Sequence, residues 1–143
     1  VASRWCIDVA RVYFAGHSDG GSISMGVTFM GKSTLEPSAI VASGAGIRAS
    51  DLSHYQCPRP TRITLLHSVE DERFPGFGEE TIAWWAKCNA CSTRASVSDS
   101  EGCFAYAGCA APTRFCPTRG AHAHWPATPA ALLDFLQPAP PPR

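Results

Sequence analysis

The residues with the clearest chemical meaning are the pentapeptide Gly-His-Ser-Asp-Gly at positions 16–20. An apolar run at residues 12–15 precedes it, and a run that can begin a helix follows at 21–25. A serine on a tight turn between a strand and a helix forms a nucleophile elbow, and glycines two residues to either side keep Cβ atoms out of a crowded backbone. Ordinary surface turns also contain this pentapeptide, but the flanking runs favour the elbow. The pattern therefore predicts Ser18 as a catalytic nucleophile.

A nucleophilic serine needs a base that takes its proton and an acid that orients the base. In α/β-hydrolases these groups follow along the chain in the order serine, acid, histidine. Asp71 comes a few residues after the apolar run at 63–67, and the carboxyl edge of a parallel sheet is where such sites are built. Its neighbours Glu70 and Glu72 are alternatives for the same role. Charged loops after strands are also often simply solvated.

The histidine is expected in a loop before the last helix, where the chain has both His122 and His124. Position alone does not separate these two. His17, beside the nucleophile, and His67, at the end of a strand, are expected to pack or to form hydrogen bonds rather than to act as bases. The backbone N–H of Asp19 is the expected oxyanion donor, because the positive end of the following helix supports it.

The apolar periodicity predicts alternating strands and helices. Strands are expected at 11–15, 39–44 and 63–67, short strands at 104–107 and 113–116, and helices at 18–30, 79–87 and 130–136. One face of the first helix would carry Ile23, Val27 and Met30, and one face of the last would carry Leu132, Leu133 and Leu136. Apolar strands of this kind are typical of strands buried on both faces, so we expect an α/β fold with a mostly parallel sheet and flanking helices.

Composition and charge exclude several classes of protein. With 45% apolar and 17% charged residues, the 143-residue chain can bury the core of one globular domain. Twelve basic and twelve acidic residues give no net charge, and Lys and Arg do not cluster. Nucleic acid and membranes are therefore not expected as partners. We expect a single domain over residues 1–136 and a disordered, Pro-rich tail at 137–143.

Seven cysteines, six of them after position 56, are many for a cytosolic protein and favour disulfides in an oxidising compartment. The odd number leaves at least one cysteine unpaired within the chain. Cys88 and Cys91, with Cys103, Cys109 and Cys116, also permit a zinc site, since thiolates at short spacing suit tetrahedral coordination. Their spacings do not repeat a zinc-knuckle pattern, so disulfides are favoured, and no metal or other cofactor is expected.

The ordered motifs resemble the secreted α/β-hydrolase esterases grouped as polyhydroxybutyrate depolymerase-like, feruloyl and acetylxylan esterases. The resemblance extends from about residue 4 to residue 136. Its segments are Cys6-Ile-Asp8, Ala10-Arg-Val-Tyr13, the elbow through Gly21, residues 42–46, His67-Ser-Val-Glu-Asp71 with Pro75, Trp84-Trp-Ala86, Cys91, Cys109, Cys116 and the final Gly, His and Trp125-Pro126.

This resemblance implies Ser18 as the nucleophile, Asp71 as the triad acid and a histidine of the 120–126 loop as the base. The family usually has Gly-His-x-Trp-Pro, whereas here Ala123 stands two residues before the tryptophan, with a histidine on either side. We prefer His122, which keeps a Gly-x-His lead-in, and His124 is the alternative.

The resemblance also implies a serine carboxylic-ester hydrolase that works through an acyl-enzyme. Its substrates would be feruloyl or acetyl esters of plant polysaccharide or polyhydroxyalkanoate-type esters, including polymeric ones, and we expect a secreted monomer. Family members carry about a hundred further residues upstream, which hold the first strands and the second oxyanion donor. Only fifteen residues precede Gly16, and they contain no His-Gly loop. We therefore expect the C-terminal portion of one α/β-hydrolase domain, lacking the N-terminal strands. The alternative is a catalytically inactive remnant or binding module.

Overall fold

The computed structural model describes residues 4–31, 36–92, 95–98, 102–127 and 129–136. A short 3-10 helix, η1, comes first (Val9–Arg11). The strands are β1 (Tyr13–His17), β2 (Ala39–Ser43), β3 (Arg62–Ser68), β4 (Ala95–Ser98), β5 (Phe104–Tyr106) and β6 (Thr113–Thr118). The helices are α1 (Asp19–Gly26), α2 (Ala49–Leu52), α3 (Phe77–Cys88) and α4 (Pro129–Leu136). The expected tail at 137–143 lies outside the described residues.

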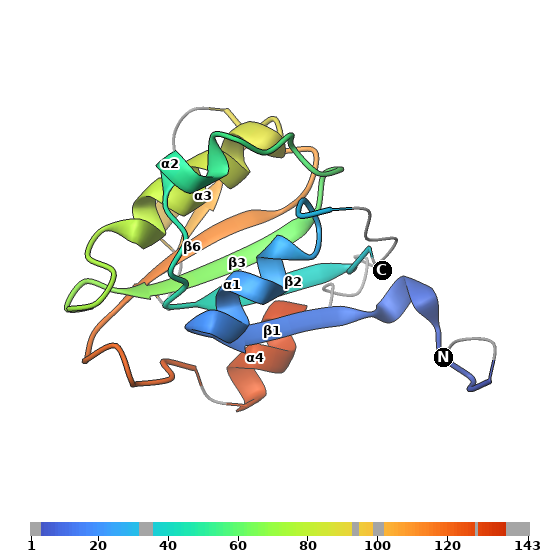
Figure 1. Ribbon diagram of the computed structural model, residues 1–143, viewed down its shortest axis with the longest axis horizontal. Helices are drawn as coiled ribbons and strands as arrows, with labels where there is room; N and C mark the ends of the chain where they lie inside the picture. The colour runs from blue at the N-terminus through green and yellow to red at the C-terminus, as the bar shows by residue number, and fades with distance from the viewer. Residues whose placement is uncertain (1–3, 32–35, 93–94, 99–101, 128, 137–143) are drawn as a thin grey trace.

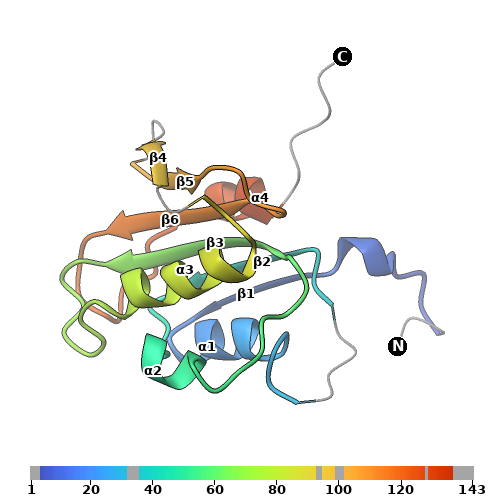
Figure 2. The ribbon, with the colours of Figure 1, turned by 90° about the horizontal axis from the view of Figure 1, so that it is seen from above.

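The strands form one six-stranded sheet in the order β1-β2-β3-β6-β5-β4. The pairs β1–β2, β2–β3 and β3–β6 are parallel, whereas β5 and β4 continue the sheet antiparallel. Helices α1, α2 and α3 lie on one face and α4 lies on the other (Figures 1 and 2). Right-handed crossovers that advance in one direction along a sheet place their helices on one face, as here. The predicted α/β fold with a mostly parallel sheet is confirmed.

Each face of the sheet carries its own apolar core, and β2 contributes to both. All five residues of β2 are buried. Successive side chains of a strand point to opposite faces, so Ile40 and Ala42 face α1 and α3, while Ala39 and Val41 face α4. The first core contains Met25, Ile63, Leu65, Ile82, Trp85 and Phe115, and the second contains Leu66, Cys103, Cys116, Phe135 and Leu136.

Helix α1 differs from its prediction in length and in the face that it buries. It ends at Gly26, and Ile23 and Met30 are 64% and 51% exposed, so the predicted apolar face is wrong. The buried face carries small residues together with Met25. The reason is a close approach of backbones, because a Cβ at Gly21 would lie 2.8 Å from the carbonyl oxygen of Ser43. A helix this near the sheet has no room there for a large side chain.

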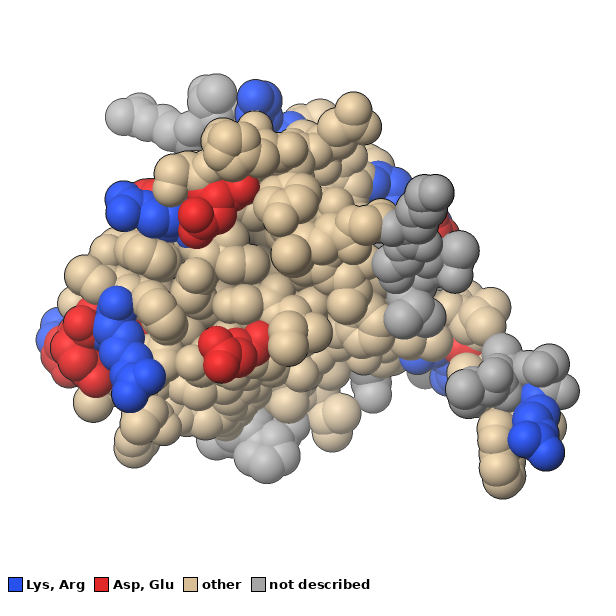
Figure 3. Space-filling view, viewed as in Figure 1, with Lys and Arg blue, Asp and Glu red and all other residues tan. Residues whose placement is uncertain are grey.

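The other elements follow their predictions with local differences. The run at 113–116 belongs to β6, a parallel strand beside β3, while β4 was not predicted. In α4, Leu136 is buried but Leu133 is 55% exposed, and Phe135 takes part in the core in its place. Figure 3 shows a face that is mostly uncharged, with blue and red groups beside one another at its left edge.

Three disulfides join Cys57 to Cys88, Cys91 to Cys109 and Cys103 to Cys116. The prediction of disulfides is confirmed. Cys88 and Cys91, which also permitted a zinc site, each belong to one of these disulfides. Cys6 is free and exposed. Such bonds are typical of an extracellular or otherwise oxidising environment. Among the described helices, none combines the length and apolar character that crossing a membrane requires.

A buried amide, Asn89, ties the end of α3 to the starts of two strands. Its Oδ1 accepts the N–H of Thr61 at 3.0 Å, and its Nδ2 donates to the Thr61 carbonyl at 2.9 Å and to Thr113 Oγ1 at 2.7 Å. Asn89 is fully buried, so water cannot replace these bonds. The side chain therefore fixes where β3 and β6 begin relative to α3.

We expect Asn89→Ala to lower the free energy of unfolding by about 2–4 kcal/mol, because it leaves buried donors and acceptors without hydrogen-bond partners. Urea denaturation measures the loss. Ser53→Ala is the matched control, since it also removes a side-chain hydrogen bond, to the Ser50 carbonyl, but at an exposed position. Equal losses in the two variants would contradict the role given to Asn89.

Candidate active site

Ser18 lies at the junction between β1 and α1, at the carboxyl edge of the sheet. Its backbone has φ 55° and ψ −119°, a conformation that non-glycine residues rarely adopt. The N–H of Ser18 donates to the carbonyl of Ser43 at the end of β2, at 2.8 Å. The strained turn is thus held by the neighbouring strand, and it presents the serine hydroxyl above the sheet edge.

Two glycines make this turn possible. Gly16 belongs to the pentapeptide, whereas the second is Gly21, which follows it, and not Gly20. A Cβ at Gly16 would lie 2.2 Å from the carbonyl carbon and oxygen of Gly20. A Cβ at Gly20 would meet nothing within 4 Å, so the expectation that this glycine avoids a clash is wrong. Gly20 is exposed in the first turn of α1, and Gly21 is the residue that faces the sheet.

Asp71 is 4% exposed and lies in the loop that follows β3. Its Oδ1 accepts the backbone N–H groups of Arg73 and Phe74, both at 2.9 Å, which fixes the plane of the carboxylate. Burial by itself raises the pKa of Asp71, but the hydrogen bonds from His122, Phe74 and Arg73 outweigh it, so the pKa lies below its ordinary value. The carboxylate is therefore ionised at neutral pH.

His122 bridges Asp71 and Ser18. Its Nδ1 lies 2.8 Å from Asp71 Oδ2, and its Nε2 lies 2.9 Å from Ser18 Oγ. An ionised carboxylate only accepts hydrogen bonds, so Nδ1 carries the proton and the neutral ring offers Nε2 as acceptor for the Ser18 hydroxyl. The imidazole is 6% exposed, and the ring of Phe74 packs edge-on against it at 5.1 Å between centroids.

The structure separates residues that the sequence left as alternatives. His124 is exposed, and its backbone N–H caps a turn by donating to the Ala121 carbonyl. Glu70 accepts the N–H of Gly120 at 2.9 Å, and Glu72 accepts the N–H of His122 at 3.0 Å. Both glutamates thus hold the backbone of the histidine loop, while Asp71 alone of the three meets the imidazole. The His122 N–H is also the main cause that lowers the pKa of Glu72.

The remaining sequence candidates lie around this chain of hydrogen bonds. Asp19 is the first residue of α1, and N–H groups in the first turn of a helix have no acceptor within the helix. His67 is buried, and its Nε2 donates to the Phe74 carbonyl at 2.8 Å, as expected of a packing residue. Sequence reasoning did not single out Phe74, although it follows the acidic run by only two residues.

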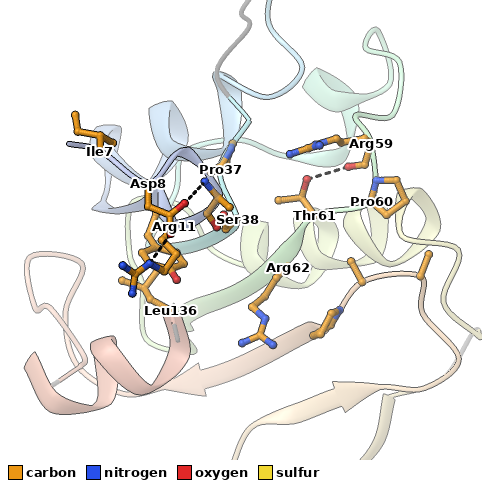
Figure 4. Close-up of a pocket in the computed structure, with 15 residues that line it drawn as sticks. Ile7, Asp8, Arg11, Pro37, Ser38, Arg59, Pro60, Thr61, Arg62 and Leu136 are labelled. Carbon is orange, nitrogen blue, oxygen red and sulfur yellow. Dashed lines mark hydrogen bonds and ion pairs between the residues drawn. The ribbon is translucent and has the colours of Figure 1, made fainter. Parts of the chain in front are cut away.

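Other parts of the described structure offer less chemistry. Within the ranges that the structure describes, no group of three or more His, Cys, Asp or Glu side chains is arranged to hold a metal ion. A cavity of about 950 Å³ opens at the opposite, amino edge of the sheet (Figure 4). Arg11 and Arg59 line it, but they pair with Asp8 and Glu36 at 2.9 and 2.8 Å. That cavity contains none of the residues in the Ser18–His122–Asp71 chain.

Comparison with known proteins assigns no family to this geometry. No protein-family model matches the chain, and no curated protein matches it. The class of the protein is therefore defined by its own fold and site: an α/β protein with a serine, a histidine and an aspartate joined by hydrogen bonds at the carboxyl edge of its sheet.

We expect Gly16→Ala to lower the free energy of unfolding by about 2–3 kcal/mol, because its Cβ would overlap the backbone of Gly20. Gly20→Ala is the matched control and should be neutral or slightly stabilising, since alanine favours the helix by about 0.5–1 kcal/mol. Chemical denaturation of the two variants measures both changes. A Gly16→Ala variant as stable as Gly20→Ala would refute the close approach.

The lowered pKa of Asp71 predicts a pH-dependent stability. The folded chain holds the carboxylate at a lower pKa than the unfolded chain does, so this contribution is complete above the ordinary Asp value and is lost as the pH falls through the lowered one. Asp71→Asn removes it. The difference in unfolding free energy between wild type and Asp71→Asn should therefore shrink below roughly pH 4.

Urea denaturation over a series of pH values measures that difference. Asp134→Asn, at an exposed position in α4, is the control whose difference from wild type should be small at every pH. A difference for Asp71→Asn that is the same at neutral and acidic pH would show that the carboxylate contributes nothing by its ionisation.

Proposed function

We propose that this chain is a serine carboxylic-ester hydrolase of the α/β-hydrolase type. The single observation that carries the proposal is the continuous chain of two hydrogen bonds, 2.9 Å from Ser18 Oγ to His122 Nε2 and 2.8 Å from His122 Nδ1 to Asp71 Oδ2. These three residues are far apart in the sequence and come together at one sheet edge. Nucleophile, base and orienting acid in this arrangement are the machinery of acyl transfer.

The reaction follows from the direction of these bonds. Ser18 Oγ attacks the ester carbonyl while His122 Nε2 takes the hydroxyl proton, and Asp71 stabilises the imidazolium that forms. When the tetrahedral intermediate collapses, His122 gives the proton to the departing alkoxide and an acyl-serine is left. A water molecule then attacks the acyl group with His122 again as base, and the carboxylic acid is released as Ser18 regains its proton.

The backbone N–H of Asp19 is the proposed donor to the oxyanion. It directly follows the nucleophile at the start of α1, where the helix dipole favours developing negative charge. The aromatic ring of Phe74, packed against His122, and the half-buried Trp125 beside His17 supply apolar surface near the base. They suit the acyl portion of an ester better than a charged group.

The substrate class and location are extended from the motif resemblance. Feruloyl or acetyl esters of plant polysaccharide, or polyhydroxyalkanoate-type esters, are the proposed substrates, and the aromatic side chains of Phe74 and Trp125 near His122 and His17 offer them apolar surface. The three disulfides are consistent with an oxidising environment, and secretion of the protein is the corresponding proposal. A secreted esterase of this class would act on polymeric substrates outside the cell.

Hydrolysis of p-nitrophenyl acetate, with labelling by a fluorophosphonate probe, tests the function. We expect Ser18→Ala to abolish labelling, and both Ser18→Ala and His122→Ala to lower kcat by roughly 10⁴–10⁶-fold. His124→Ala is the matched control and should keep the wild-type rate, because His124 is exposed and its hydrogen bond to the Ala121 carbonyl is made by its backbone N–H.

The proposal would be refuted by a folded wild-type chain that neither hydrolyses the ester nor reacts with the probe. That outcome would favour a non-catalytic remnant or binding module that keeps the elbow. Loss of activity in His124→Ala with retention in His122→Ala would instead reassign the base.

A further inference from the structure

His17, the residue before the nucleophile, connects Ser18 to the loop that carries the base. It is the last residue of β1, and its ring reaches His122 from the strand side. Its Nε2 lies 2.7 Å from the backbone carbonyl oxygen of His122, and its Nδ1 lies 3.1 Å from Ser43 Oγ. Three segments, the ends of β1 and β2 and the histidine loop, thus meet at one imidazole.

The chemistry of the partners fixes the protons on this ring. A carbonyl oxygen only accepts hydrogen bonds, so His17 Nε2 carries a proton and donates to His122. In the neutral ring Nδ1 is then an acceptor for the hydroxyl of Ser43. The bond to the His122 carbonyl also exists in the protonated ring, so the tie does not depend on the charge of His17.

The peptide groups of His122 are consequently held on both sides. Its N–H donates to Glu72 at 3.0 Å, and its carbonyl accepts from His17 at 2.7 Å. Glu72 belongs to the loop after β3, whereas His17 is joined by a single peptide bond to the nucleophile. Of these two ties, only the one through His17 relates the backbone of the base directly to the serine.

Packing around His17 leaves little freedom for either ring. The rings of His17 and His122 lie 5.3 Å apart between centroids, and Trp125 packs edge-on against His17 at 5.6 Å. Gly44, with φ 51°, lies against both histidines: a Cβ there would lie 3.0 Å from Cε1 of His17 and 3.5 Å from Cε1 of His122. Because Gly44 has no side chain, the rings of His17 and His122 fit into this space.

We propose that His17 is a positioning residue, which holds the His122 carbonyl through its Nε2–H and thereby sets the separation of His122 Nε2 from Ser18 Oγ. This inference rests on the proposed function. It assigns His17 no contact with substrate and no proton transfer. Small displacements of a catalytic base are costly, and an error of about 1 Å lowers a rate by about 10²-fold.

Two substitutions separate the hydrogen bond from the bulk of the ring. His17→Phe keeps an aromatic ring and loses the donor, whereas His17→Gln keeps an N–H close to the position of Nε2. We expect His17→Phe to lower kcat for p-nitrophenyl acetate by about 10–10²-fold with KM within about twofold, and His17→Gln to recover most of the loss. His54→Phe, at an exposed position, is the matched control and should retain the wild-type kcat.

A second measurement does not depend on catalysis. The proton between His122 Nδ1 and Asp71 should give a low-field NMR resonance in the wild type and in His17→Gln. In His17→Phe this resonance should broaden or disappear, because the loop that presents His122 is no longer held. A thermal unfolding curve with a folded baseline at the assay temperature establishes that each variant is folded.

The outcomes distinguish the two proposals. If His17→Phe keeps the wild-type kcat and resonance, or if His17→Gln is as impaired as His17→Phe, the positioning role of the N–H is wrong. If the folded wild type shows no hydrolysis and no probe labelling, the proposed function is wrong. In that case the NMR resonance still tests whether His17 holds the His122 carbonyl. Loss of the resonance in His17→Phe but not in His17→Gln supports this structural role, and its retention in His17→Phe refutes it.

Discussion

The site depends on the register in which four parallel strands end. His17 pairs with Ser43 across β1 and β2, Ser43 pairs with Leu66 in β3, and Ser68 pairs with Thr118 in β6. Parallel strands in this register deliver the loops that follow them to the same edge of the sheet. Ser18 comes one residue after β1, Asp71 three residues after β3 and His122 four residues after β6. A slip of one residue in any pair would turn every side chain of that strand to the other face.

The elbow adds a second constraint, because a strained serine persists only where its surroundings over-determine it. The Ser18 N–H is bound to the Ser43 carbonyl, and the same carbonyl limits what can stand at position 21. The helix after the serine must therefore lie so close to β2 that glycine is the residue that fits. This explains why α1 buries small residues and exposes Ile23. The strain at Ser18 and the unusual amphipathicity of α1 have one cause.

The sequence was informative where local chemistry and chain order were enough. Apolar runs located β2 and β3, and the order of serine, acid and histidine selected Ser18, Asp71 and the pair His122 and His124 for comparison. Choosing between the two histidines requires the path of a loop that carries no periodic signal, and the choice depends on which ring meets Asp71. The helix face at α1 was mispredicted because periodicity measures apolar character and not the distance between backbones. The role of Gly20 was mispredicted because the pentapeptide does not show which glycine faces the sheet, and the close contact is made by its neighbour Gly21.

The run Glu70-Asp71-Glu72 shows how three adjacent acids can serve one loop. Like charges this close repel one another, and hydrogen-bond donors offset that repulsion. The loop from 120 to 122 supplies them: Glu70 accepts the N–H of Gly120, Asp71 accepts from the His122 ring and Glu72 accepts the N–H of His122, at 2.9, 2.8 and 3.0 Å. The N–H groups of Arg73 and Phe74 donate hydrogen bonds to Oδ1, the other carboxylate oxygen of Asp71. Backbone donors thus offset the repulsion within the run, and the run in turn holds His122. The central carboxylate is left to orient the imidazole because its neighbours fix the backbone on which that imidazole stands.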